Sequence, residues 1–286
     1  MPRRVAIAML SECESLVRAA DKDRWLASLF APDEPRAHLM ALYAFNIEVA
    51  RIREAVSEPG IGEIRLQWWA DAIEAIYAGN TPDHPVAQAL AAAIAHGNLD
   101  QTSFLNLIEA RRFDLYDDPM PDMATLEGYL GETASVLFQM AASILSGPAA
   151  RSASDVSGFG GVAYGLTGLL RALPIHRRRG QMYLPADVLA RHGVSAVELR
   201  AGRITPALAA ALADLRVHAT QRLTQARKAA AAMPADALPA YLPLSLVEGY
   251  QKALTKLGPQ AVNTVAEVAQ WKRQWRLWRC AAGKRF

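Results

Sequence analysis

The sequence predicts an all-α fold in which residues 1–286 form a single domain. Alanine and leucine are abundant, 52% of the residues are apolar, 21% are charged, and runs of β-branched residues are few. Amphipathic stretches of helical length recur, and no alternation typical of strands persists between them. The segments that separate these stretches are too short to be domain linkers, so one helical bundle is expected.

Breaks rich in proline and glycine set the expected helix boundaries. After one of them, Asp122 and Thr125 precede apolar residues at helical spacing, and Gly147 with Pro148 ends that helix. The glycine-rich segment 158–165 has an apolar context without a preceding strand, so we expect close helix packing there rather than phosphate binding. The breaks lie at residues 31–35, 57–62, 79–85, 117–122, 146–149 and 233–239.

Charge, cysteines and the N-terminus limit the class of protein. A formal net charge of +3 is too small to indicate nucleic-acid binding, although it suits phosphorylated ligands or an anionic membrane surface. Cys13 and Cys280 lie far apart without a metal-binding pattern, which favours a reducing compartment. The apolar run after the N-terminal arginines has only six residues, too short for a signal sequence or a spanning helix. We expect a cytoplasmic protein that can associate peripherally with the inner face of the membrane.

Acidic residues at helical spacing occur in the stretch 43–69. Glu54 and Glu58 are four residues apart, so on one helix they could hold Mg²⁺ together. A proline follows Glu58, however, and helices tend to end before proline. We therefore favour a solvated helix face on which acids pair with Arg51 and Arg53.

A second acidic cluster lies in RRFDLYDD, residues 111–118. If this segment is helical, Asp114 and Asp118 are one turn apart with Asp117 adjacent, which would suit a metal ion. The alternative is a helix that ends before the following proline and leaves the last two aspartates in a loop.

Positive charge is concentrated between Pro174, expected to break or kink a helix, and Gly180. His176, Arg177, Arg178 and Arg179 occupy this segment. Guanidinium groups suit phosphate oxygens, so contact with phosphate or anionic lipid is one interpretation, and a solvated basic loop is the other.

Near the C-terminus, the segment WKRQWRLWRC combines tryptophans with basic residues. At ~100° per residue, Trp271, Trp275 and Trp278 share a narrow helix face. Lys272, Arg273, Arg276 and Arg279 flank it. We expect the tryptophans to dock into the bundle, with a membrane interface as the alternative.

Three blocks, taken together, resemble the squalene/phytoene synthase family. They are LMALYAFNIEVARIREA followed by RLQWWADAIEAIYAG and HPVAQAL, then LIEARRFDL with LEGYLGETA, and GLTGLLRALPIHRRRGQMYLP. Their order follows the family from about Asp21 to Gly193. The resemblance implies an isoprenoid synthase bundle with a central cavity.

The family's two aspartate-rich motifs, which hold Mg²⁺ and substrate diphosphates, are not matched. The first falls on Ala50, Arg51 and Glu54, with the family's arginine at Ile47. The second falls on Ala172, Ile175 and His176, with its glutamine and asparagine at Gly165 and Gly168. Other family positions are retained, namely the Trp68–Trp69 pair, the His84–Pro85 turn, Asp114, Tyr129, Arg171 and Tyr183 with its Leu-Pro. The ligand-binding candidates are Arg51, Asp114, Tyr129, Arg171 and Tyr183.

The residues of these blocks resemble one branch of the family, which includes an assembly factor for respiratory complex I. This implies a non-catalytic assembly factor, or a lipid- or isoprenoid-binding factor, without a cofactor and with complex I subunits or assembly intermediates as partners. The alternative is an active prenyltransferase that uses farnesyl or geranylgeranyl diphosphate. Such an enzyme would need Mg²⁺ at a relocated site formed by Asp114, Asp117 and Asp118.

Overall fold

The computed structural model describes the backbone of residues 3–286 and the side chains from Ser11 onward. Over this range it is 80% helical and contains no strand, which confirms the all-α prediction. The N-terminal apolar run discussed above lies outside the described side chains. No helix between residues 3 and 286 has both the length and the apolar character needed to cross a bilayer.

Sixteen α-helices follow one another along residues 3–286. The first nine are α1 (Arg3–Ala20), α2 (Lys22–Ser28), α3 (Asp33–Ala50), α4 (Ile52–Ala55), α5 (Pro59–Tyr77), α6 (Pro85–Gly97), α7 (Gln101–Ala110), α8 (Met123–Leu130) and α9 (Val136–Ser146). The others are α10 (Ser154–Arg178), α11 (Ala186–Arg191), α12 (Ala196–Arg200), α13 (Pro206–Ala229), α14 (Leu238–Tyr241), α15 (Val247–Leu257) and α16 (Gln270–Ala282). Three short turns matter below: the 3₁₀ turns η1 (Arg111–Leu115) and η6 (Leu242–Leu246), and the π-helical turn η2 (Gly131–Ser135).

The predicted breaks fall between helices or at their ends. Pro59 and Pro85 start α5 and α6, where the missing N–H would have no helical partner anyway. The Asp122 carboxylate caps α8 by accepting a hydrogen bond from the Thr125 backbone N–H at 2.7 Å. One boundary was not predicted: α3 ends at Ala50 and α4 begins at Ile52.

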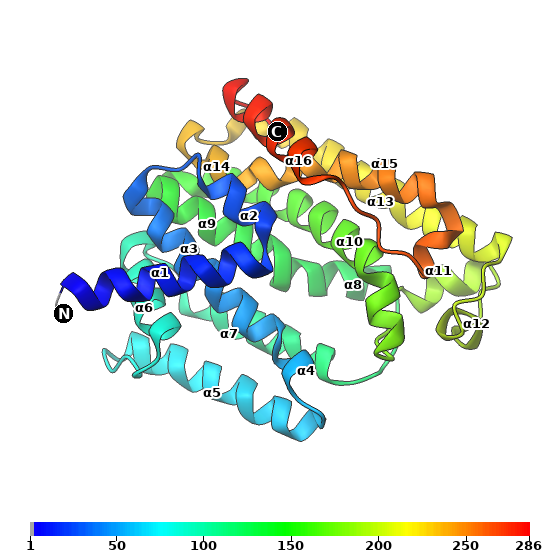
Figure 1. The fold of residues 1–286 in the computed structure, drawn as a ribbon, viewed down its shortest axis with the longest axis horizontal. Helices are drawn as coiled ribbons and strands as arrows, with labels where there is room; N and C mark the ends of the chain where they lie inside the picture. The colour runs from blue at the N-terminus through cyan, green and yellow to red at the C-terminus, as the bar shows by residue number, and fades with distance from the viewer. Residues whose placement is uncertain (1–2) are drawn as a thin grey trace.

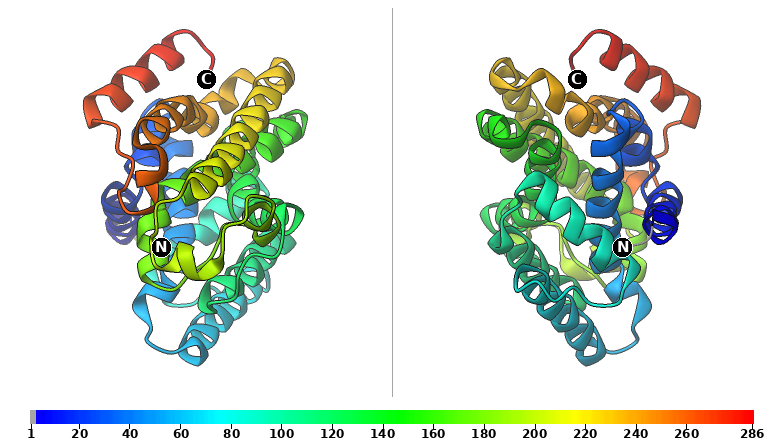
Figure 2. Two further views of the ribbon diagram at one scale, coloured as in Figure 1. Left: turned by 90° about the vertical axis from the view of Figure 1, so that its right-hand side faces the viewer. Right: turned by 90° about the vertical axis from the view of Figure 1, so that its left-hand side faces the viewer.

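Helix α10 runs through the middle of the molecule and packs most extensively against α13 (Figure 1). Its residues enter two groups of buried apolar side chains. Val156 and Ala163 pack into a core shared with α1, α3, α6 and α9, whereas Leu166 and Leu170 pack into a core shared with α8 and α13. Figure 2 shows α5 and α16 at opposite ends of the bundle.

Close packing along the glycine-rich part of α10 is confirmed. A Cβ added at Gly161 would overlap the backbone of Ser135 in η2, so only glycine allows this approach. Pro174 does not break the helix as expected, because α10 continues to Arg178. Both Leu173 and Pro174 are buried, so packing offsets the hydrogen bond that the proline ring removes.

Helix α16 packs with the opposite face from the one expected. Leu277 and Cys280 are buried, whereas Trp271, Trp275 and Trp278 are exposed. The expectation that the tryptophans dock into the bundle is therefore wrong. The smaller apolar side chains fill the contact with η6, and basic residues beside them find carboxylate partners in the bundle.

Candidate functional site

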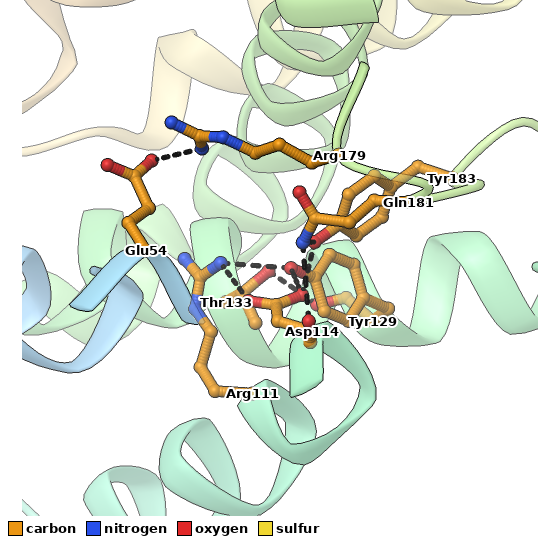
Figure 3. A network of polar contacts seen from close by, with 8 residues as sticks. All are labelled: Glu54, Arg111, Asp114, Tyr129, Thr133, Arg179, Gln181 and Tyr183. Atoms are coloured by element: carbon orange, nitrogen blue, oxygen red, sulfur yellow. Dashed lines mark hydrogen bonds and ion pairs between the residues drawn. The ribbon is translucent and has the colours of Figure 1, made fainter. Parts of the chain in front are cut away.

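A buried carboxylate lies where α7, α8 and α10 come together. Asp114 is in η1, directly after α7, and its Oδ1 accepts hydrogen bonds of 2.7 Å from both Tyr129 of α8 and Tyr183 (Figure 3). Arg111 donates to Oδ2 of Asp114 at 3.0 Å and to the Tyr129 hydroxyl at 2.9 Å. We call Arg111, Asp114, Tyr129 and Tyr183 the Asp114 cluster.

The backbone bridge between Pro119 and Met182 brings the far part of the cluster into place. It fixes the segment after α10 beside the segment after η1, so that Tyr183 reaches Asp114. Gln181 supports both, since its Nε2 donates to the Asp114 carbonyl and to the Tyr183 hydroxyl, each at 3.2 Å. Three residues retained from the family pattern, Asp114, Tyr129 and Tyr183, are thus in direct contact.

The Asp114 cluster holds its protons tightly. Burial, together with the neighbouring Asp114, raises the pKa of Tyr183, and burial likewise raises the pKa of Tyr129. Both tyrosines therefore stay protonated and donate to the carboxylate at neutral pH. With two hydroxyls and a guanidinium already bound, the carboxylate has little remaining capacity to act as a base or to bind a metal ion.

His176, on the α10 side of this region, is neutral at physiological pH. Its ring centroid lies 4.7 Å from that of Tyr183. Burial lowers its pKa to about 4, although Asp114 acts in the opposite direction. The position where the family has an aspartate therefore carries an uncharged imidazole.

A cavity of about 250 Å³ adjoins the cluster. The described residues that line it include no Asp or Glu. Two polar atoms in its wall, Oδ1 of Asn46 and Nε of Arg111, are buried without a hydrogen-bond partner. The remaining lining is given by Arg24, Tyr129, Leu130, Thr133, Ala134, Leu137, Tyr164, Gly165, Gly168, Leu169, Ala172 and His176. Chemically, this cavity offers cationic and neutral donors but no metal-binding carboxylate.

Arg24 is a cavity residue that the sequence interpretation missed. Its guanidinium pairs with Asp21 at 2.7 Å and lies 5.0 Å from the ring centroid of Tyr164. Asp21 also caps α2 by accepting from the Arg24 backbone N–H. The spacing of Asp21 and Arg24 was a local signal for that cap, but no local pattern indicates that α2 faces the cavity.

Two of the predicted ligand-binding residues lie apart from the Asp114 cluster. Arg51 is exposed at the end of α3 and lines a shallow surface pocket of about 270 Å³ with Arg65 and Trp68. Arg171 stacks 3.5 Å from the centroid of the Tyr250 ring and donates to the Ala266 carbonyl at 3.2 Å. The structure therefore does not bring all five candidates into one cavity.

The aspartates of the alternative metal site do not converge either. Asp117 and Asp118 are exposed, whereas Asp114 is buried. An ion pair of 3.6 Å joins Asp117 to Arg53. The physical reason is that η1 ends at Leu115 and the chain then extends toward Pro119, which turns the last two aspartates to solvent.

Glu54 is exposed, as a solvated helix face predicts, but the expected pairing with Arg51 or Arg53 is wrong. Glu54, on α4, pairs with Arg179 at 2.6 Å (Figure 3). The carboxylate at a former motif position is thus neutralised by an arginine from the end of α10. Among the described residues, the only group of three potential metal ligands consists of Glu34, His38 and His96, on α3 and α6.

The basic segment after Pro174 is not a solvated loop. It continues α10, and Arg177 donates to the carbonyls of Val262 and Arg200 at 3.3 and 2.9 Å. With Arg179 paired to Glu54 and His176 half-buried beside Tyr183, Arg178 alone of the four is exposed without a bond among the described residues.

Comparison with known sequences agrees with these observations. The family model described as squalene/phytoene synthase matches residues 17–279. "NADH dehydrogenase (ubiquinone) complex I, assembly factor 6" of Rattus norvegicus is 32% identical over 271 residues, which cover 92% of this chain and 81% of the relative. Phytoene synthase of Thermus thermophilus is 33% identical over 204 residues, covering 70% and 67% of the two chains.

Solved structures show the same arrangement of helices. A dehydrosqualene synthase in complex with a ligand has a TM-score of 0.85 at 19% identity, over 99% of this chain and 98% of its own. A squalene synthase from Alicyclobacillus acidocaldarius has a TM-score of 0.78 at 22% identity, over 92% and 98%. The fold is therefore the all-α isoprenoid synthase fold, as the resemblance implied.

Proposed function

The chain belongs to the squalene/phytoene synthase family, and on that premise we propose that it is a non-catalytic assembly factor for respiratory complex I. The main observation in support of this proposal is the cavity lining, which has cationic and neutral donors but no carboxylate among the described residues. Ionising an allylic diphosphate requires its developing negative charge to be stabilised, which the family's metal sites do through bound Mg²⁺. The similarity to assembly factor 6 of mammals supports the same conclusion.

The state of Asp114 also supports the loss of catalysis. Its carboxylate is buried and already accepts bonds from Tyr129, Tyr183 and Arg111. Binding a metal ion here would require breaking those bonds, while the other two acids of the alternative site, Asp117 and Asp118, remain in solvent. We therefore expect no resident Mg²⁺.

We propose further that the cavity retains a site for the head group of an isoprenoid diphosphate or an anionic lipid. Guanidinium groups bind phosphate oxygens directly, and Arg24 and Arg111 both reach the cavity wall. At about 250 Å³ the cavity is smaller than the roughly 300–1,000 Å³ typical of small-molecule pockets, so it suits a head group better than two prenyl substrates.

Assembly of a membrane-bound respiratory complex also suggests where the protein works. We propose that it acts in the cytoplasm at the inner face of the membrane, with complex I subunits or assembly intermediates as its partners.

The catalytic question is tested by incubating the purified protein with farnesyl or geranylgeranyl diphosphate and Mg²⁺. We expect no release of pyrophosphate, with a phytoene synthase as the positive control. Turnover that is lost in both Asp114→Ala and Asp118→Ala would instead establish the prenyltransferase alternative with its relocated metal site.

The assembly role is tested by deleting the gene and measuring NADH:ubiquinone oxidoreductase activity in membranes. We expect this activity to fall and to return when the wild-type gene is restored. Unchanged activity in the deletion strain would contradict the proposal.

Head-group binding is tested by calorimetry with farnesyl diphosphate in the presence of EDTA. Asn46→Asp places a carboxylate in the cavity wall at nearly constant volume, so it should weaken binding by about tenfold or more. Asn80→Asp, at an exposed position, is the matched control. Binding that requires Mg²⁺, or that responds equally to both variants, would contradict this part of the proposal.

A further inference from the structure

Helix α16 has two faces of opposite character. Leu277 and Cys280 are buried, and the other face exposes Trp271, Trp275 and Trp278 by 65%, 58% and 54%. At ~100° per residue the three tryptophans lie within about 60° of one another, on the side of the helix roughly opposite Leu277 and Cys280. We call these three residues the tryptophan face. Since the helix is already docked by its other face, the tryptophan face is free for an outside partner.

The tryptophan face forms a continuous aromatic surface. Trp275 and Trp278 stack with their ring centroids 5.1 Å apart, and Trp271 lies under the ammonium group of Lys272 at 5.4 Å. Within residues 11–286, the indole N–H groups of these tryptophans make no hydrogen bond, in contrast to Trp25, which donates to Glu14 at 3.2 Å. An indole with an apolar body and an unused N–H suits the boundary between acyl chains and head groups.

The charged side chains of the segment that carries the tryptophan face are of one sign. Residues 270–286 contain six lysines and arginines and no Asp or Glu. Two of the six are used internally: Arg273 pairs with Asp23, and Arg276 pairs with Glu248 at 2.6 Å. Within the described side chains, no ion pair is formed by the other four, which are Lys272, Arg279, Lys284 and Arg285. This complement suits an anionic surface.

The position of α16 allows it to meet a flat surface. It lies at the end of the molecule opposite α5 (Figure 2), where it contacts mainly α2 and η6. Beside it, Phe30 and Trp278 line a largely apolar groove of about 720 Å³, and Leu29 is exposed next to Phe30. The apolar surface therefore extends from the tryptophan face toward the turn after α2.

We infer that α16 lies in the plane of an anionic bilayer, with the tryptophan face inserted at the level of the head groups. Lys272, Arg279, Lys284 and Arg285 then contact lipid phosphates. With 13 residues the helix is about 20 Å long, too short to cross a hydrocarbon core of about 30 Å but suited to lying within the interface. The tryptophan face is then the surface through which the protein reaches the peripheral membrane location proposed above. The observations that support this contact do not depend on the complex I role.

A bilayer fits this face better than a protein partner does. Hot spots between proteins are aromatic and arginine side chains that fill well-packed pockets on the partner. Here the tryptophans are exposed on the helix, and the charged residues of the segment 270–286 are all positive. A surface of uniform negative charge with an apolar interior matches both features.

The test is co-sedimentation of the full chain with vesicles of phosphatidylcholine alone or of phosphatidylcholine with phosphatidylglycerol. We expect binding to the anionic vesicles that weakens with added salt. Replacing all three tryptophans by alanine should weaken binding by about tenfold or more, and Lys272→Glu with Arg279→Glu should do the same. The tryptophan fluorescence of the wild type should shift to shorter wavelength on binding.

Two matched variants control for changes that are not specific to α16. Trp68→Ala removes an exposed tryptophan from α5, and Arg191→Glu reverses an exposed charge on α11. Both should bind vesicles like the wild type. Because every substituted side chain is exposed, far-ultraviolet circular dichroism should show unchanged helix content in all variants.

Three results would overturn the inference. They are failure of the wild type to bind anionic vesicles, binding unchanged by the triple tryptophan substitution, and equal losses in Trp68→Ala. If vesicles are not bound but the triple variant fails to restore complex I activity in the deletion strain, the face serves a protein partner instead. Loss of vesicle binding in the triple variant, with complex I activity restored by that variant, would support membrane binding by this face and separate it from the proposed assembly role.

Discussion

The Asp114 cluster and the tryptophan face differ in the burial of their characteristic side chains. In the cluster, a charged carboxylate is buried, and its bonds to Tyr129, Tyr183 and Arg111 are completed within the chain. On α16, large apolar rings are exposed, and the basic residues beside them include several without an internal partner. In a protein of this family, the Asp114 carboxylate is thus satisfied within the chain, whereas the surface of α16 carries groups without an internal partner.

This difference indicates where an external partner is to be sought. A buried polar group with its bonds completed contributes to a specific core but offers little to a ligand. Moving an exposed tryptophan ring out of water lowers the free energy. Exposed tryptophans therefore favour binding to an external partner. Four measurements would break or sharpen this comparison.

The largest expected effect comes from removing the centre of the cluster. Asp114→Ala leaves the Arg111 guanidinium and two tyrosine hydroxyls buried without their acceptor, so the free energy of unfolding should fall by about 3–5 kcal/mol. Urea denaturation followed by circular dichroism measures the loss. Asp118→Ala, at an exposed position, should change stability by no more than about 0.5 kcal/mol. Equal effects of the two variants would mean that the cluster is not a structural centre.

The pH dependence of stability tests the neutral state of His176. Its pKa is lowered from 6.5 to about 4 in the folded state, so the unfolded state binds more protons between these values. The neutral imidazole therefore makes its full contribution to the free energy of unfolding above about pH 6.5. This contribution is lost as the pH falls toward 4, by at most about 3 kcal/mol.

The matched variant for this measurement is His176→Gln, which cannot gain a proton. Burial raises the pKa values of Glu127 and Glu248, but hydrogen bonds to arginine outweigh it and lower both values. Their contributions to the free energy of unfolding are therefore lost in acid in both proteins. The difference between wild type and variant between pH 7 and pH 4.5 isolates the histidine. Parallel stability curves would show that folding does not lower the pKa of His176.

A smaller effect is expected where α10 meets η2. Gly161→Ala forces a methyl group into the backbone of Ser135 and should destabilise the protein by about 1–3 kcal/mol. Gly168→Ala, on the same helix with no atom near its added Cβ, should instead stabilise it by about 0.5–1 kcal/mol through helix propensity. Thermal unfolding of the pair measures both, and the same sign in both would contradict the close contact.

The smallest effect on stability is expected at the tryptophan face. Because Trp271, Trp275 and Trp278 are more than half exposed, replacing Trp275 with alanine should change the free energy of unfolding by less than about 0.5 kcal/mol. Chemical denaturation of this variant and of Leu277→Ala gives the contrast. Leu277 is buried and should cost about 2–5 kcal/mol. A large loss in Trp275→Ala would mean that the ring is packed in solution.

Much of the fold could be predicted from the sequence because its signals are local. Helix periodicity, the prolines at the starts of α5 and α6 and the cap at Asp122 act over a few residues. The family pattern likewise named Asp114, Tyr129 and Tyr183 among the candidate residues, and the structure brings these three into contact. Arg51 and Arg171 could not be placed this way, since their surroundings depend on how helices remote in sequence pack.

The sequence by itself determined that α16 is amphipathic, because helical geometry puts its three tryptophans on one side. Only the tertiary structure decided which side meets the bundle. Arg273 finds Asp23, 250 residues away, and Arg276 finds Glu248 and the Ser245 carbonyl. These partners come from α2, η6 and α15, and together with the burial of Leu277 they hold the tryptophans outward. Local patterns fix which side chains share a face, but long-range contacts determine what that face meets.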